Sequence, residues 1–299
     1  RACYEPSNSP NNSFERQQFH GVCTAHQLLN NGLNCLILVD IAHPENWRIN
    51  TKMQTLAPQL DAIMFDYGNT LIEFGPSQVN ACDRALSDAL HGMFGPHDFD
   101  QLQKIQHHER RSPYQGEFKE NDLAGTTRSL IQSLFHTEAS DNQVAELLEV
   151  RFNVMVSSID IDPTVQQLLE RLSTRFRLGL ISNYPCSRSI NHSLAEHNLD
   201  RWFETVVVSA DVGHVKPHPK LFDLAVSSMD VRREATLYVG DNWLGDIQGA
   251  KRFGMKAAWI RQYIPYEDFP ENPGDHQPDL VVEHLSELAA LAPPIAEQN

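Results

Sequence analysis

"FDYGNTLI", residues 65–72, joins a short apolar run to a polar loop. The run "AIMF" has the composition of a buried strand, and Asp66 stands where that strand ends. Gly68 and Asn69 follow it, and both residue types suit a tight loop with an accessible backbone. Taken alone, an aspartate after a strand is most often a helix cap, so the meaning of Asp66 depends on the rest of the chain.

Apolar runs alternate with amphipathic helical patterns from residue 61 onward. Residues 76–158 hold helical patterns only, and after "SIDIDP" the strands and helices alternate regularly as far as "DLVVEHLSELAAL". Strands separated by helices of this length form βαβ units and a parallel sheet. We therefore predict an α/β fold with a doubly wound, Rossmann-like core at 58–75 and 160–292, a helical insertion at 76–159 and a C-terminal tail at 293–299.

The first 57 residues differ from the rest of the chain. "EPSNSPNNSFERQQFH" is rich in Asn, Ser, Gln and Pro and shows little helical or strand periodicity. The chain begins with Arg1, and Met53 comes just before the folded pattern. We expect 1–57 to be a poorly ordered leader, and we hypothesise that 1–52 is not part of the native product. The mass of the protein from its natural host would test this.

Composition and charge exclude several classes of function. The 299 residues are 41% hydrophobic and carry a net charge of −15, which argues against a nucleic-acid partner. No run approaches the ~18 apolar residues of a membrane helix, and no signal peptide is recognisable. The five cysteines include no CxxC pair, so a disulfide framework or structural zinc site is not expected. We predict a soluble cytoplasmic protein without a membrane partner, and the oligomeric state stays open.

Polar residues gather where the predicted strands end. Ser182 and Asn183 follow the run "LGLI", and Asp241 follows "LYVG" with Asp246 five residues later. Lys216 lies in "HVKPHPKLF", in the loop before a helix. A parallel sheet brings the carboxyl ends of its strands to one edge, where ligands bind. We therefore expect these side chains to meet Asp66 in one crevice.

The chemistry of this set suits a phosphoryl group. Three carboxylates in one crevice repel one another unless a cation neutralises them, and oxygen ligands favour Mg²⁺. Lys216 adds a positive charge, Ser182 adds a hydroxyl donor, and the loop at Gly68 and Asn69 offers backbone N–H groups. Such groups stabilise the charge of a phosphoryl group better than they fit a neutral substrate.

Four motifs now identify a resemblance. "FDYGNTL", "LGLISN", "HVKPHPKLF" and "YVGDNWLGDIQGAKRFGMKAAWI" resemble, in this order, the motifs of the haloacid dehalogenase-like (HAD) hydrolase superfamily, and the likeness runs over about residues 61–291. The resemblance implies that Asp66 is a nucleophile that forms an aspartyl-phosphate. It implies that Ser182 and Lys216 hold the phosphoryl group, with Lys216 also steadying Asp66. The insertion resembles the small helical cap of this family, which closes over the site and excludes water.

The same resemblance implies the remaining ligands. A magnesium ion would be bound by Asp66, the Gly68 carbonyl, Asp241 and, directly or through water, Asp246. From their positions in the loop after the first strand and beside Ser182, we also expect Gly68, Asn69 and Asn183 to contact the substrate.

Gly68 departs from the pattern of the family's phosphatases. They usually carry a second aspartate two residues after the nucleophile. Its side chain protonates the leaving oxygen and then activates water, and its carbonyl binds the metal. Gly68 can perform only the second task. A general acid–base contributes about 10²–10⁴-fold to a rate, so its loss should matter.

Three functions remain open. We favour a Mg²⁺-dependent hydrolase of small phosphate esters that uses another proton donor, such as His214 or the pair His107 and His108, or that prefers good leaving groups. The second is a 2-haloacid dehalogenase. Dehalogenases of the family, however, carry tyrosine two places after the nucleophile and lack the first aspartate of the last motif, whereas this chain has both Asp241 and Asp246. The third is a catalytically weak binding or regulatory protein on the same fold.

The stretch "HHERRSPYQGEFKEN" is the most charged part of the insertion. Arg110 and Arg111 could grip a second anionic group of the substrate, because guanidinium groups suit carboxylate and phosphate. The alternative is a solvated helix end whose charges favour the helix dipole. Tyr114 and Phe118 line a pocket or simply pack. A small phosphorylated metabolite is the expected partner, since a small cap must close over it.

Overall fold

The computed structural model describes residues 51–263, 269–272 and 274–293, all within one compact unit that spans 43–299. The leader expected at 1–50 lies outside the described residues. The predicted boundary at residue 57 is wrong, because residues 51–56 are helical and a 3₁₀ turn, η1 (Ala57–Gln59), follows. Met53 and Leu56 are buried in the main hydrophobic core, so this segment belongs to the folded protein.

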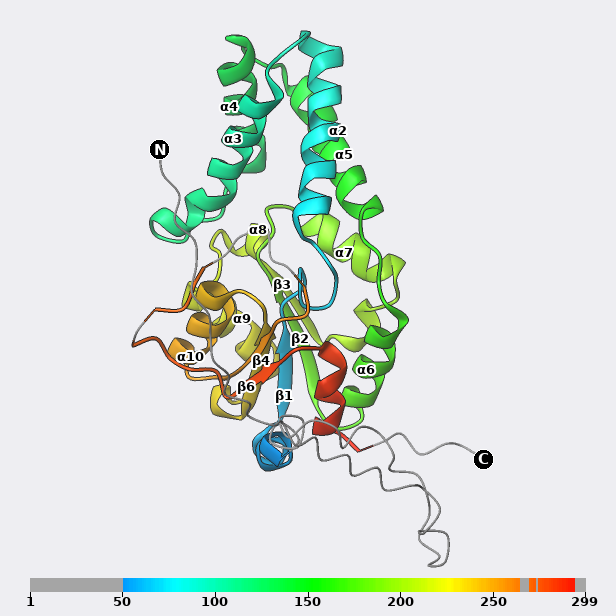
Figure 1. Ribbon diagram of the computed structural model, residues 1–299, viewed down its shortest axis with the longest axis vertical. Helices are drawn as coiled ribbons and strands as arrows, with labels where there is room; N and C mark the ends of the chain where they lie inside the picture. Colours follow the sequence, from blue (N-terminus) through cyan, green and yellow to red (C-terminus); the bar gives the residue numbers. More distant parts are fainter. Residues whose placement is uncertain (1–50, 264–268, 273, 294–299) are drawn as a thin grey trace, which may run out of the picture. The chain divides into compact units, whose positions relative to one another are not determined.

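A six-stranded parallel sheet forms the centre of the fold, with strand order β3-β2-β1-β4-β5-β6 (Figure 1). The strands are β1 (Ala62–Phe65), β2 (Arg177–Ser182), β3 (Thr205–Val208), β4 (Thr236–Gly240), β5 (Lys256–Ile260) and β6 (Leu280–Val282). All residues of β1 are buried, as in a strand that is covered on both faces. The predicted doubly wound α/β fold is confirmed.

Helices cover both faces of the sheet, and the two-residue repeat of β1 explains how. Ile63 and Phe65 join a core that also contains residues of α6 (Pro163–Ser173), α7 (Ser187–Glu196) and η6 (Leu285–Leu291). Ala62 and Met64 point to the opposite face and join a core with α9 (Pro219–Met229) and α10 (Gly249–Phe253). Figure 1 shows these two sets of helices on either side of the strands.

The insertion folds into four helices with a core of their own. The helices are α2 (Pro76–Phe94), α3 (Phe99–Arg111), α4 (Leu123–Phe135) and α5 (Asp141–Ser157). Their shared core is apolar and consists of Leu86, Leu90, Leu102, Leu130, Ile131 and Leu147. Three of the helices begin at polar caps, Asp98, Asp122 and Ser140, whose side chains accept backbone N–H bonds. We call these helices the helical subdomain; its role as a cap stays a prediction.

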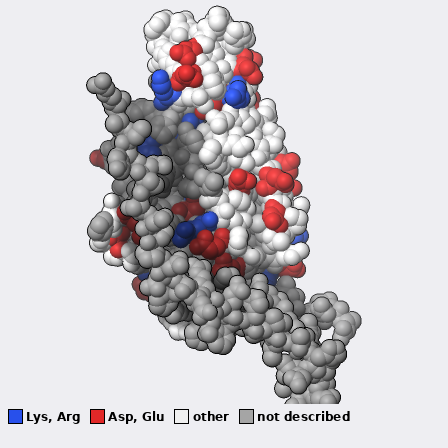
Figure 2. Space-filling view, viewed as in Figure 1, with Lys and Arg blue, Asp and Glu red and all other residues white. Residues whose placement is uncertain are grey.

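The surface follows the composition of the chain. On the face shown in Figure 2, acidic side chains are spread over the molecule with Lys and Arg among them. Among the described helices, none is both long enough and apolar enough to cross a membrane.

Candidate active site

The carboxyl ends of three neighbouring strands deliver the predicted residues to one place. β1 lies between β2 and β4, and Phe65 is in register with Leu180 and Val239. Asp66, Ser182 and Asp241 therefore stand at the ends of adjacent strands. All predicted site residues line one cavity of about 310 Å³: Asp66, Gly68, Asn69, Ser182, Asn183, Lys216, Asp241 and Asp246.

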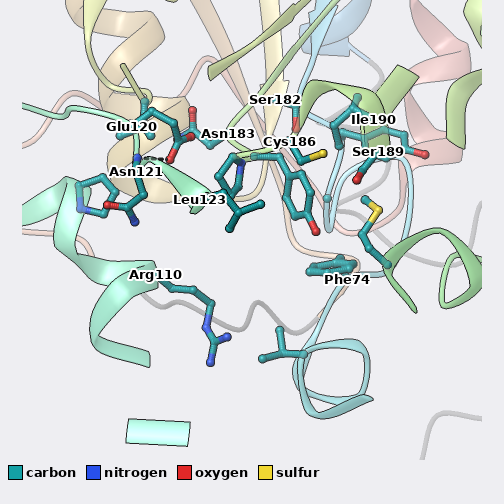
Figure 3. Close-up of a pocket in the computed structure, with 18 of the residues that line it drawn as sticks. Phe74, Arg110, Glu120, Asn121, Leu123, Ser182, Asn183, Cys186, Ser189 and Ile190 are labelled. Atoms are coloured by element: carbon teal, nitrogen blue, oxygen red, sulfur yellow. Dashed lines mark hydrogen bonds between the residues drawn. The ribbon is translucent and has the colours of Figure 1, made fainter. Parts of the chain in front are cut away.

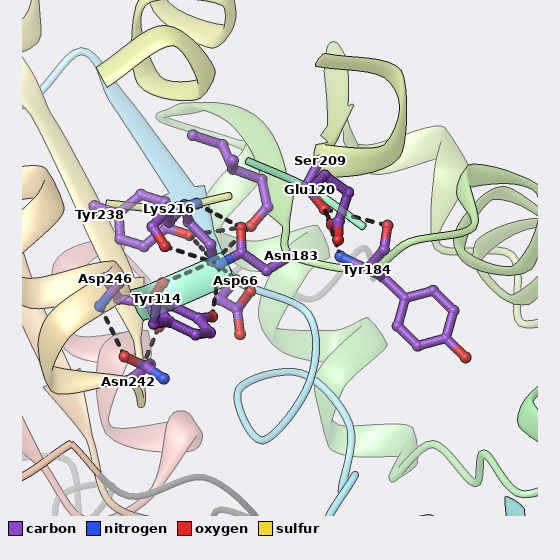
Figure 4. Close-up of polar contacts among 12 residues, drawn as sticks. Asp66, Tyr114, Glu120, Asn183, Tyr184, Ser209, Lys216, Tyr238, Asn242 and Asp246 are labelled. Carbon is purple, nitrogen blue, oxygen red and sulfur yellow. Dashed lines mark hydrogen bonds and ion pairs between the residues drawn. The ribbon is translucent and has the colours of Figure 1, made fainter. Parts of the chain in front are cut away.

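Lys216 is the centre of this cluster, although it comes from a loop (Figure 4). Its Nζ lies 2.6 Å from Asp66 Oδ1 and 2.7 Å from Asp246 Oδ1. It also donates to the Tyr238 hydroxyl at 2.8 Å and to the Ile181 carbonyl at 3.0 Å. Burial alone would lower the pKa of Lys216, but the two aspartates outweigh it and raise the pKa well above its ordinary value. The side chain is therefore a buried, permanently charged ammonium group.

Asn183 fixes the backbone that carries Lys216. Its Oδ1 accepts the Lys216 N–H at 2.7 Å, and its Nδ2 donates to the Lys216 carbonyl at 3.1 Å. The same Nδ2 donates to the hydroxyl of Tyr114 at 3.0 Å. Tyr114 belongs to η2 (Ser112–Gln115) of the helical subdomain, so this contact joins the subdomain to the sheet edge. The amide that we expected to bind substrate is thus already used to position Lys216.

Three carboxylates crowd the same edge. Asp66, Asp241 and Asp246 each place one oxygen within 4.8 Å of the others. Burial raises the pKa of Asp66 to about 6, with Lys216 opposing and Asp246 reinforcing the shift. Burial, together with Asp66 and Asp246, raises the pKa of Asp241 well above its ordinary value. A hard divalent cation would relieve this repulsion, and the oxygen-only donor set fits Mg²⁺.

A short π-helical segment, η5 (Trp243–Gln248), holds Asp246 in place. Asp246 Oδ2 accepts the Asn242 N–H at 2.9 Å, and Asn242 Oδ1 accepts the Gly245 N–H at 2.7 Å. Gly240 makes room for this carboxylate, because a Cβ there would lie 2.3 Å from Asp246 Oδ2. Glycine at the end of β4 is therefore required by the close approach of Asp246.

The loop after β1 is held by its own hydrogen bonds. Asn69 has a left-handed backbone with φ of 54°, and its Oδ1 accepts the Phe74 N–H at 3.0 Å. Its side chain therefore stabilises the loop. Gly68 has space beside it, because an added Cβ would meet only Phe74 Cβ at an ordinary 3.6 Å. Crowding at the Cβ position therefore does not require glycine here.

The helical subdomain supplies the other end of the cavity, where Arg110 lies in Figure 3. Arg110 donates to both carboxylate oxygens of Asp83, at 3.1 and 3.4 Å. Arg111 instead lies over the ring of Phe269, 5.1 Å from its centroid, and is not among the lining residues. Tyr114 lines the cavity, whereas Phe118 does not.

The histidines considered as proton donors lie elsewhere. The lining residues identified in the described part of the chain do not include His107, His108 or His214. His214 packs against His218, with ring centroids 4.0 Å apart and the ring planes tilted by 32°.

The cavity also contains residues that the sequence analysis missed, and two of them bear on ligand binding. Arg151 of α5 lines the cavity, and its only sequence signal is a lone arginine within the apolar stretch "LLEVRFNVMV". Ser189 of α7 also lines it, and a serine on an amphipathic helix carries no such signal.

Comparisons with known proteins show what this chain is similar to. A curated relative, glyceraldehyde 3-phosphate phosphatase of Methanopyrus kandleri, is 30% identical over 149 residues, which are 50% of this chain and 62% of that protein. The chain thus spans less than two thirds of the length of this relative.

Solved structures are similar over most of the chain. The 2-haloacid dehalogenase of Pseudomonas syringae pv. Tomato is 25% identical, with a TM-score of 0.61 over 78% of this chain and 97% of that one. The putative HAD-hydrolase YfnB of Bacillus subtilis, bound to magnesium, is 21% identical, with a TM-score of 0.57 over 77% and 96%. The sequence model of the haloacid dehalogenase-like hydrolases matches residues 97–260, more than half of the chain. The protein is therefore a member of the haloacid dehalogenase-like hydrolase family.

Proposed function

We propose that the protein is a Mg²⁺-dependent hydrolase of small phosphate esters that acts through an aspartyl-phosphate on Asp66. The observation that carries this proposal is the contact of Lys216 Nζ with Asp66 Oδ1 at 2.6 Å, inside a cavity that also holds Asp241 and Asp246. A carboxylate nucleophile, a fixed ammonium group and two further carboxylates form a set suited to phosphoryl transfer. The phosphatase named among the relatives supports it.

The metal would be held by the clustered carboxylates. Asp66, Asp241, Asp246 and the Gly68 carbonyl are the ligands that we assign to Mg²⁺. The bound ion would neutralise these carboxylates and the charge of the transferred phosphoryl group. A magnesium-bound structural neighbour of the same fold is consistent with this assignment.

The first step transfers the phosphoryl group to Asp66. Lys216 engages Oδ1 of this carboxylate, which leaves Oδ2 to attack phosphorus. The new bond joins Oδ2 to phosphorus, and the bond from phosphorus to the ester oxygen breaks. Lys216 and the Ser182 hydroxyl would hold the phosphoryl oxygens. The departing alkoxide needs a proton, which Gly68 cannot give.

Tyr114 is the donor that we assign to this step. Its hydroxyl accepts a hydrogen bond from Asn183, so its own proton is directed elsewhere, and the described residues provide no acceptor for it. Burial raises the pKa of Tyr114, which keeps the hydroxyl neutral. The proton would pass to the alkoxide, which is the stronger base. The resulting phenolate would then take a proton from the water that attacks the aspartyl-phosphate, releasing phosphate and restoring Asp66 and Tyr114.

A pair of assays separates the candidate functions. The purified protein should release phosphate from 4-nitrophenyl phosphate with Mg²⁺, lose this activity with EDTA, and lose it in Asp66→Asn. Chloride release from 2-chloropropionate that does not depend on metal would replace the proposal with the dehalogenase function. The absence of both activities in folded protein would favour a binding role.

A further inference from the structure

The cavity lining contains a cationic group, Arg151, that the proposed chemistry does not use. Arg151 projects from α5, and its Nε and Nη2 atoms are buried without a hydrogen-bond partner among the described residues. A guanidinium carries five N–H donors, and unsatisfied buried donors are costly. Such a group inside a ligand-sized cavity indicates that the ligand supplies the missing acceptors.

The neighbouring arginine provides an internal comparison. Arg110 is held in a two-oxygen pair by Asp83, so a partner within the protein already meets part of its donor set. The charged groups that act most strongly on Arg151 include Glu109, Arg110 and Asp83, all from the helical subdomain. Glu109 does not form an ion pair with Arg151 in the described structure, and its carboxylate accepts from Gln106 at 2.7 Å. Burial raises the pKa of Glu109, which weakens it as a counterion.

A second unpartnered donor lines the same cavity. The Ser189 side chain is 1% exposed, and its Oγ has no hydrogen-bond partner among the described residues. Figure 3 shows it beside Cys186 and Ile190 on the wall formed by α7. Apolar side chains of Leu148, Phe152 and Met155 complete the lining near α5. Arg151 and Ser189 thus offer donors without partners in a wall that combines apolar side chains with a few polar ones, as in small-molecule sites.

We propose that Arg151 binds a second anionic group of the substrate, so that the preferred substrates are small phosphate monoesters whose organic part ends in a carboxylate or a second phosphate. The phosphate-ester end of this inference rests on the function proposed above. Carboxylate and phosphate share the paired oxygens that match a guanidinium fork. A cavity of about 310 Å³ is at the small end of ligand pockets, which favours substrates of a few carbon atoms.

A matched series of three-carbon phosphate esters tests this inference. The probes are 3-phosphonooxypropanoate, propane-1,3-diyl bisphosphate, 3-hydroxypropyl phosphate and 3-aminopropyl phosphate. They share a three-carbon chain and the phosphate ester, and they differ in the distal group, which is anionic, neutral or cationic. Steady-state kinetics compare the wild type with Arg151→Met. The control is Arg128→Met, which removes an arginine of α4 that pairs with Asp141 on the surface.

We expect Arg151→Met to raise KM about 10- to 100-fold for the two probes with an anionic tail, 3-phosphonooxypropanoate and propane-1,3-diyl bisphosphate. KM for 3-hydroxypropyl phosphate should stay nearly unchanged. The two anionic probes distinguish a carboxylate from a phosphate as the preferred group. An equal rise for all probes, or no rise for either anionic probe, overturns the inference. So does a wild-type preference for the amine-tail probe, which would point to Glu109 as the recognition group.

Binding of a non-hydrolysable analogue separates this inference from the proposed function. Calorimetry would compare 4-phosphonobutanoate with butylphosphonate, whose chain ends in a methyl group. If Arg151→Met weakens only 4-phosphonobutanoate, the anion site stands even where no ester is hydrolysed. If the wild type binds both equally, or neither, the site is refuted while hydrolysis of simple esters would still support the proposed function.

Discussion

Replacing Gly68 with aspartate should increase kcat for alkyl phosphates. The backbone at this position accepts a side chain, because an added Cβ would meet only Phe74 Cβ at an ordinary 3.6 Å. A well-placed general acid–base is worth about 10²–10⁴-fold. The gain here should be lower, because a fourth carboxylate would join three that already lie within 4.8 Å of one another.

The size of that penalty can be bounded. Two unit charges about 5 Å apart repel by about 3 kcal/mol at an effective dielectric constant of 20, and bound Mg²⁺ offsets much of it. We therefore expect Gly68→Asp to raise kcat for propyl phosphate by about 10- to 100-fold at saturating Mg²⁺. 4-Nitrophenyl phosphate should respond much less, because nitrophenolate departs without a proton.

Three further variants make the experiment decisive. Gly68→Asn has nearly the same shape but cannot transfer a proton, so it should give no gain. Tyr114→Phe should slow propyl phosphate hydrolysis at least about 10-fold in the wild type and much less in Gly68→Asp, where the aspartate takes over. Tyr184→Phe is the matched control, since Tyr184 also lines the cavity but its hydroxyl points away from the acidic cluster (Figure 4). A gain in Gly68→Asn equal to that in Gly68→Asp would refute the reasoning, as would unchanged kcat in a folded, Mg²⁺-binding Gly68→Asp.

Three other predictions concern stability and metal binding. Lys216→Met should destabilise the metal-free protein by about 3–5 kcal/mol in urea denaturation, because Asp66 and Asp246 lose their buried counterion; an unchanged midpoint would contradict this. Burial raises the pKa of Asp66 from 3.8 to about 6, so the folded protein holds that proton more tightly than the unfolded chain does. Below pH ~4 the protonated carboxyl should therefore add about 3 kcal/mol to the free energy of unfolding of the metal-free protein. This stabilisation is lost as the pH rises through ~6. The loss should appear as a pH-dependent difference in unfolding free energy between the wild type and Asp66→Asn, and it should shrink when Mg²⁺ is added. A difference that does not change with pH would count against this prediction. Gly240→Ala should displace Asp246 and so weaken Mg²⁺ binding, measured by calorimetry, at least about 10-fold. Gly92→Ala is the control, because nothing lies within 4 Å of its added Cβ. It should stabilise α2 by about 0.5–1 kcal/mol. Equal Mg²⁺ affinity in both glycine variants would show that Asp246 tolerates the shift.

Local pattern was enough to predict the sheet and the sheet end of the cavity. Strand runs such as "AIMF" and "LGLI" are short and apolar, the helices between them are amphipathic, and parallel strands place their carboxyl ends at one edge. The sequence alone therefore places Asp66, Ser182 and Asp241 together. The boundary at residue 57 failed because Met53 and Leu56 show too short an apolar pattern to reveal that they pack into the main core.

The amino-acid sequence by itself determined the fold class, the strand-end carboxylates and the missing acid at Gly68, because each depends on residues close together in the chain or on the rule that parallel strands end at one edge. Only the tertiary structure decided which groups from the helical subdomain face those carboxylates. The contact of Tyr114 with Asn183 joins residues 69 positions apart. The pairing of Arg110 with Asp83 and the burial of Arg151 Nε and Nη2 without a hydrogen-bond partner among the described residues depend on how α2, α3 and α5 pack. Such contacts arise from three-dimensional packing, and no periodicity along the chain encodes them.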